Sequence, residues 1–294
     1  MYQTKLNQKS NILEISNLNK SLNAKIHLNQ GASLQELTLD GKVVIGVLNP
    51  LVYADTYASA ILFPFANRIK DGAYAFNGEK FQLDTNQKKE QNALHGLVYN
   101  KTFKVISENI NEDKVSVELS YTETYPIKGF PYTYRVNLVY TFTKKSLNLN
   151  VSITNTDSKS FPFTLGWHPY FLSENLYSSS LNFSSNKKIV LGERNITTSI
   201  EKIEDKGTLD IKDKQLDDCW VLNSNKVQFN TPDYKFVLDS SEKDNFLQVY
   251  TPPKKNVIAI EPTTGVSDSF NNKIGLKILK PNAIYNIIWN LNII

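Results

Sequence analysis

Residues 134–153, YRVNLVYTFTKKSLNLNVSI, set the fold class of this 294-residue chain. Apolar side chains alternate with polar ones over 134–142 and again over 147–153. Successive side chains of a strand point to opposite faces of a sheet, so this alternation is typical of half-buried strands. The pair Lys144-Lys145 between the two segments predicts a hairpin turn.

The same two-residue period returns at 115–121 and at 283–293, and sustained helical periodicity is nearly absent. Many strands with short polar connections predict an all-β protein, a large antiparallel β-sandwich or barrel with few short helices. A helical turn is expected at 55–60, 265–277 is ambiguous, and 184–213 is expected to hold long loops. No shift in composition marks a linker, so we expect residues 1–294 to form a single domain.

Composition excludes several classes of protein. Hydrophobic residues make up 40% and charged residues 21%, which is typical of a soluble chain with a sizeable core. The net charge of +4 comes from lysines that are scattered along the chain, and runs such as 86–89 resemble solvated turns. A nucleic-acid surface usually needs a clustered basic stripe, so none is expected. No apolar run resembles a signal peptide or a membrane span. We therefore expect a cytoplasmic monomer or homodimer without membrane partners, and the single Cys219 fits a reducing compartment.

Two of the three histidines stand in unusual surroundings. His95 lies in NALHG and His168 in GWHPYF, whereas His27 lies in an alternating strand pattern. Histidine exchanges protons near neutral pH, so His95 and His168 are candidate acid–base groups. A packing role remains the alternative for both, and it is the preferred interpretation for His27.

Two further segments carry polar groups inside apolar sequence. Asn67 and Arg68 follow FPFA and together offer several hydrogen-bond donors and one acceptor, which suits a polyhydroxylated ligand. A structural pairing of Arg68 with a carboxylate is the alternative. Glu261 ends the apolar run VIAI before Pro262. Burial there would raise its pKa toward that of a general base, whereas a solvated strand end is the alternative.

The segment LDDCW contains two adjacent carboxylates, Asp217 and Asp218. Neighbouring side chains of a strand face opposite ways, so one of them can bind a ligand while the other is solvated. Cys219 is expected to be a packing thiol. The candidates lack the short ligand spacing of a metal site, and glycine-rich phosphate loops are absent, so neither a metal nor a nucleotide cofactor is expected.

Taken in order, these segments resemble the aldose 1-epimerase (galactose mutarotase) family over nearly the whole chain. The matching segments are 31–37 (GASLQEL), 67–69 (NRI) with Gly72, 94–96 (LHG), 168–171 (HPYF), Asp217 and 260–263 (IEPT). The resemblance implies a galactose mutarotase-like supersandwich that binds a monosaccharide without cofactor or metal. It implies Glu261 as general base, His168 as general acid and His95 as a second site histidine. It also implies that Asn67, Arg68 and Asp217 hold the sugar.

Departures from the family pattern suggest a divergent branch. Leu97 stands where many members carry a second glycine, and Trp167-His168-Pro169 replaces Asn-His-Ser. The preferred sugar therefore stays open. The alternatives are a non-catalytic carbohydrate-binding protein, an epimerase of a phosphorylated sugar, and a glycoside hydrolase or lyase. Trp167 or Phe270 is expected to lie against a sugar face.

Overall fold

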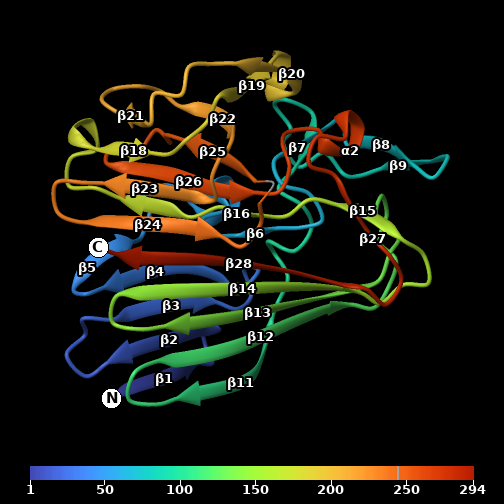
Figure 1. Ribbon diagram of the computed structural model, residues 1–294. Helices are drawn as coiled ribbons and strands as arrows, with labels where there is room; N and C mark the ends of the chain where they lie inside the picture. Colours follow the sequence, from blue (N-terminus) through green and yellow to red (C-terminus); the bar gives the residue numbers. More distant parts are fainter. Residues whose placement is uncertain (244) are drawn as a thin grey trace.

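A computed structural model describes residues 1–243 and 245–294, and β-strands make up nearly all of its regular structure (Figure 1). All strand pairs among these residues are antiparallel. The prediction of an all-β antiparallel protein with few short helices is therefore confirmed. The prediction of one domain over 1–294 stays a prediction.

Three large sheets contain most of the strands. The first has five strands, in the order β1 (Tyr2–Asn7), β2 (Ile12–Asn17), β3 (Asn23–His27), β4 (Ser33–Leu39) and β5 (Lys42–Ile45). The second has nine, in the order β11 (Lys104–Ile110), β12 (Val115–Glu123), β13 (Tyr134–Phe142), β14 (Ser146–Asn155), β28 (Ile284–Ile293), β24 (Lys235–Ser240), β23 (Lys226–Asn230), β18 (Ser180–Asn182) and β21 (Thr208–Asp210). The third has eight, in the order β20 (Thr197–Lys202), β19 (Lys187–Leu191), β22 (Asp217–Val221), β25 (Phe246–Tyr250), β26 (Val257–Thr263), β16 (Gly166–Trp167) and β6 (Ile61–Leu62), with β17 (Tyr170–Leu172) also paired to β26.

Smaller elements connect these sheets. Three two-stranded ladders pair β7 (Arg68–Lys70) with β10 (Asn92–Leu94), β8 (Ala73–Phe76) with β9 (Glu79–Gln82), and β15 (Phe161–Phe163) with β27 (Lys277–Leu279). The helices are α1 (Tyr53–Thr56) and α2 (Ser269–Asn272), and the 3-10 turns are η1 (Leu176–Ser178) and η2 (Glu193–Asn195). No helix of the described residues is both long enough and apolar enough to cross a membrane.

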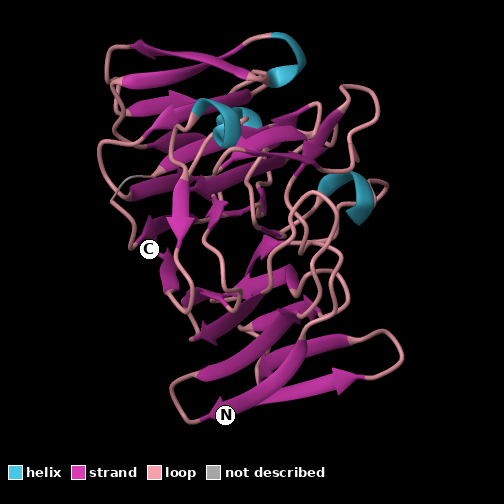
Figure 2. Cartoon of the chain, turned by 90° about the vertical axis from the view of Figure 1, so that its right-hand side faces the viewer, coloured by secondary structure: helices cyan, strands magenta, loops and turns pink. Residues whose placement is uncertain are grey.

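The predicted hairpin is β13 and β14, which pair from Tyr134↔Asn155 to Phe142↔Leu147. Every second side chain of β14 is buried, as the alternation requires. The nine-stranded sheet runs the length of the molecule, with the five-stranded sheet near one end and the eight-stranded sheet near the other (Figures 1 and 2). One hydrophobic core contains side chains from all three sheets, which makes the fold a sandwich.

Contacts between the layers show how the core is closed. The Tyr140 hydroxyl on β13 donates to the Ala32 carbonyl before β4, at 3.0 Å. Trp167 on β16 stacks on Trp289 of β28, with ring centroids 6.3 Å apart. Burying such aromatic pairs stabilises the packing of the eight-stranded sheet on the nine-stranded sheet.

The helical turn expected at 55–60 is present slightly earlier, as α1, and the ambiguous stretch 265–277 contains α2, but the expectation of long loops over 184–213 is wrong. That stretch contains β19, β20 and β21. Five of the six side chains of β20, which lies at one edge of its sheet, are exposed. Because neither face of β20 is covered along its length, its sequence shows no apolar alternation.

Candidate active site

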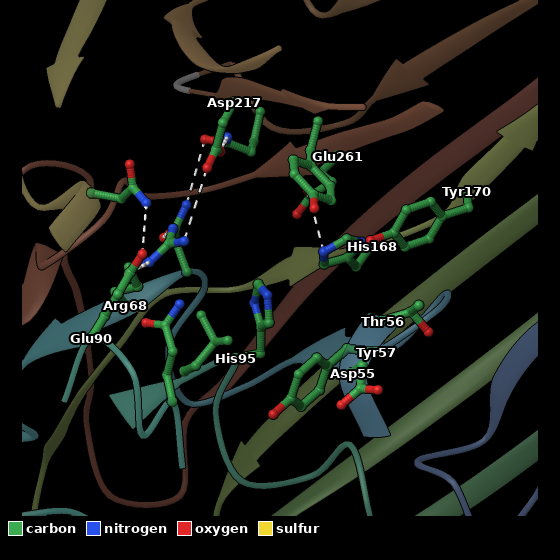
Figure 3. Close-up of a pocket in the computed structure, with 16 residues that line it drawn as sticks. Asp55, Thr56, Tyr57, Arg68, Glu90, His95, His168, Tyr170, Asp217 and Glu261 are labelled. Carbon is green, nitrogen blue, oxygen red and sulfur yellow. Dashed lines mark hydrogen bonds and ion pairs between the residues drawn. The ribbon is translucent and has the colours of Figure 1, made fainter. Parts of the chain in front are cut away.

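A polar cavity of about 360 Å³ opens between the eight-stranded sheet and the segments that carry β7, β10 and α1. This volume lies within the usual range for small-molecule sites. All six residues singled out in the sequence line it: Asn67, Arg68, His95, His168, Asp217 and Glu261. Figure 3 shows five of them, Arg68, His95, His168, Asp217 and Glu261, converging from different strands and loops.

Glu261 and His168 form the centre of the cavity. The Nε2 atom of His168 lies 3.5 Å from Oε1 of Glu261, and the two side chains are 5% and 4% exposed. Glu261 belongs to β26, which is buried along its whole length. His168 stands between β16 and β17, and its backbone N–H donates to Ala60 O at 3.1 Å. Two neighbours of β26 thus hold the imidazole against the carboxyl group.

Burial disfavours the charged form of both groups. Desolvation raises the pKa of Glu261 well above its usual range, and nearby Asp217 raises it further. Desolvation lowers the pKa of His168 to about 4. Burial therefore favours the neutral form of each group, a carboxylic acid beside a neutral imidazole. Moving that proton from Glu261 to His168 produces the ion pair without changing the total charge.

The loop that carries His95 has a left-handed backbone conformation at two successive residues. His95 and Gly96 have positive φ values of 61° and 76°. A Cβ atom at Gly96 would lie 2.3 Å from the carbonyl oxygen of Phe63, so only glycine fits there. The rings of His95 and His168 meet edge to face with centroids 4.9 Å apart. Burial and the neighbouring His168 lower the pKa of His95 well below its usual range, which indicates a neutral ring.

A hydrogen-bonded wall forms the other side of the cavity. Arg68 donates from Nη1 to Asn67 Oδ1 at 2.9 Å, and its Nε pairs with Glu90 Oε2 at 3.1 Å. Asp217 Oδ2 lies 3.9 Å from Arg68 Nη2, while its Oδ1 accepts from Gln248 Nε2 at 2.7 Å. This wall offers donors and acceptors of the kind that sugar hydroxyl groups require. The sequence left open whether Arg68 binds a ligand or pairs with a carboxylate for structure. In the structure Arg68 both lines the cavity and pairs with Glu90.

Sequence reasoning missed several residues that line the cavity, among them Tyr57, Glu90, Tyr170 and Gln248. Gln248 had a readable signal, because it is the polar residue in the buried strand FLQVY and pairs directly with Glu261. Glu90 had no such signal, since it lies within a run of polar residues that resembles a solvated turn. That interpretation is wrong for residue 87 as well, because Gln87 lines the cavity.

Two expectations about neighbouring residues had different outcomes. Trp167 and Phe270 do not line the cavity, because both are buried in the core, at 0% and 1% exposure. Asp218 turns away from Asp217 and pairs with Lys188 at 2.5 Å, as strand alternation predicts. Cys219 is a buried thiol.

Comparison with known proteins agrees with this geometry. The sequence model of the family described as aldose 1-epimerase matches residues 13–291. The chain belongs to the aldose 1-epimerase family. An uncharacterised family relative, YihR of Escherichia coli K12, is 22% identical over 279 residues, which are 89% of this chain and 87% of YihR.

Solved structures show the same sandwich fold. A galactose mutarotase-like protein from Clostridium acetobutylicum superposes with a TM-score of 0.87 at 21% identity, covering 100% of this chain and 98% of the other. The galactose 1-epimerase of Lactobacillus acidophilus NCFM gives a TM-score of 0.79 at 15% identity, covering 100% and 98%. The predicted galactose mutarotase-like sandwich is therefore confirmed, and the low identities agree with a divergent member of the family.

Proposed function

We propose that this chain is an aldose 1-epimerase that interconverts the α and β anomers of a free aldohexose. The observation that carries the proposal is the Glu261–His168 pair, buried 3.5 Å apart in a cavity with hydrogen-bonding walls. Membership of the aldose 1-epimerase family supports the same conclusion. The reaction is redox-neutral and consists of proton transfers and the opening of a hemiacetal, so the chain's own acid–base groups suffice.

The proton inventory assigns the roles. The Glu261 carboxylate accepts the proton of the C1 hydroxyl while protonated His168 donates to the ring oxygen, and the bond between C1 and the ring oxygen breaks. Rotation about the C1–C2 bond presents the other face of the aldehyde. On closure the C5 hydroxyl returns its proton to His168, and Glu261 returns its proton to the new C1 oxygen. Each group ends in its starting state.

Sugar binding places the shared proton where the reaction needs it. In the empty cavity burial favours the neutral pair, with the proton on Glu261. A bound C1 hydroxyl donates a hydrogen bond to the carboxylate, and a bound ring oxygen accepts one from the imidazolium. Both bonds stabilise the charged forms, which shifts the proton from Glu261 to His168.

The remaining residues hold the sugar. His95 lies edge-on to His168 and is placed to hydrogen-bond the ring oxygen or a neighbouring hydroxyl. Asn67, Arg68 and Asp217 bind hydroxyl groups from the opposite wall. Such positioning keeps the opened chain in place until the ring closes again.

Polarimetry of freshly dissolved α-glucose and α-galactose tests the proposal. We expect equilibration to be much faster with protein than in buffer alone. Equilibration at the buffer rate with several free aldoses would leave the alternative of a sugar-binding protein without turnover. Sugar binding measured in parallel by NMR titration separates that alternative from a protein that binds no aldose.

A further inference from the structure

Every nitrogen of the Arg68 guanidinium faces a protein acceptor. Nε pairs with Glu90, Nη1 donates to Asn67, and Nη2 lies 3.9 Å from a carboxylate oxygen of Asp217. The arginine side chain is only 12% exposed. Figure 3 shows Arg68 enclosed between Glu90 and Asp217. An arginine that binds a phosphate or carboxylate of a ligand uses these same nitrogens, often two at once.

Glu90 is held in place from a second direction. Its Oε1 accepts from Asn195 Nδ2 at 3.1 Å while Oε2 pairs with Arg68. Arg194 donates from Nε to the Glu90 backbone carbonyl at 2.5 Å, and it forms an ion pair with Asp71 at 2.8 Å. The segments around residues 90 and 194 are thus joined by hydrogen bonds at the edge of the cavity. Glu90 is therefore a fixed carboxylate rather than a mobile surface group.

The rest of the lining adds negative charge. Asp55, Glu90 and Asp217 are the acidic residues of the cavity outside the Glu261–His168 pair, in which burial favours the neutral form of both groups, and Arg68 is its basic residue. Within the described part of the chain, no lysine lines the cavity. An anionic group on a ligand would therefore meet carboxylates on the walls and a guanidinium that is already paired. Coulomb repulsion inside such a cleft is screened less than in bulk water.

We propose that Glu90 determines charge specificity: by pairing with Arg68 it makes the site accept neutral aldoses and reject aldoses that carry a phosphate or carboxylate group. The inference rests on the proposed function for its substrate class, and it excludes the alternative of an epimerase for phosphorylated sugars. Removing the Glu90 charge would free Arg68 to bind an anion. Glu90 acts on specificity and takes no part in the proton transfers.

The test compares glucose with glucose 6-phosphate as ligands of wild type and Glu90→Gln. Dissociation constants come from NMR titration, and anomerisation rates are measured beside them. We expect wild type to bind glucose at least about tenfold more tightly than the phosphate, which corresponds to about 1.4 kcal/mol. We expect Glu90→Gln to reduce this ratio about tenfold, mainly by tighter binding of the phosphate. Glu112→Gln removes the same charge from an exposed turn and should leave the ratio unchanged.

Salt provides a second measurement that needs no variant. Raising the ionic strength from about 0.02 M to 0.5 M should weaken the discrimination of wild type, because screening acts on charge and not on shape. An unchanged ratio in Glu90→Gln, or a ratio independent of salt, would overturn the inference while leaving the epimerase proposal intact. If wild type binds both sugars with this discrimination but anomerises neither, the epimerase proposal fails and the charge selection stands.

Discussion

Replacing Glu261 by glutamine should inactivate the protein and stabilise it at the same time. Glutamine has nearly the same shape as glutamic acid and can keep the contact with His168, but it cannot accept the proton of the C1 hydroxyl. General base catalysis contributes about a hundredfold to ten-thousandfold, so we expect Glu261→Gln to lower turnover at least about a hundredfold. Polarimetry of α-glucose measures this loss directly.

The stability gain follows from the raised pKa of Glu261. Between the pKa of glutamate in the unfolded chain and the higher pKa in the folded protein, folding requires the uptake of a proton. Within that window the native glutamate lowers the free energy of unfolding by up to about 1.4 kcal/mol for each pH unit, so the protein loses stability as pH rises. Glutamine removes this cost because it carries no charge.

Thermal unfolding at several pH values checks this reasoning. At pH 7 the melting temperature of Glu261→Gln should exceed that of wild type by about 2–6 °C, and the difference should vanish toward pH 4. Glu112→Gln, at an exposed site, should change stability by less than about 0.5 kcal/mol. Wild-type turnover in Glu261→Gln would refute the role of general base. A pH-independent destabilisation would refute the account of Glu261 as a desolvated group.

Three further predictions concern the same site. His168→Asn should lower turnover at least about a hundredfold with an unchanged circular dichroism spectrum, and wild-type rates would contradict its role as acid. The profile of kcat/KM against pH should fall below about pH 4, where the imidazole of His168 is protonated while Glu261 keeps its proton, and again at higher pH, where Glu261 loses its proton; an acid limb near 6.5 would contradict the lowered pKa of His168. Gly96→Ala should cost about 2–4 kcal/mol and slow turnover, because its φ is positive and the Cβ would meet Phe63. Gly78→Ala, at φ 80° with nothing within 4 Å, is the control for backbone strain alone, and equal losses in the two variants would refute the steric argument.

Strand patterning was readable wherever one face of a strand is buried. The alternation in β13 and β14 predicted both strands and the hairpin between them. The sequence of β20 did not reveal a strand, because β20 has no buried face to create an alternating pattern. The role of Glu90 was also not predicted, because a polar residue in a polar segment gives the same sequence pattern whether it is solvated or paired with Arg68.

The candidate site was only partly visible in the linear chain. His95, His168 and Glu261 stood out because each is a polar group in apolar surroundings, and their order along the chain resembles one family. Spacings of 73 and 93 residues (168 − 95 and 261 − 168) carry no geometric information by themselves. Gln248 could have been added from its place in an apolar strand, whereas Tyr57 directly follows the short helix α1 and Asn195 ends the 3-10 turn η2, and neither element is long enough to give a periodic signal.

Local side-chain chemistry was thus enough to identify the sheets, the family resemblance and the groups able to exchange protons. Folding alone brought Glu261 within 3.5 Å of His168 and removed both from water. It also placed Glu90 against Arg68, so the basic residue that lines the cavity is paired with a carboxylate. This difference between what the sequence determines and what the tertiary structure decides has a simple physical cause. Alternation is a property of neighbouring residues, whereas desolvation and Coulomb interaction depend on which distant segments pack together.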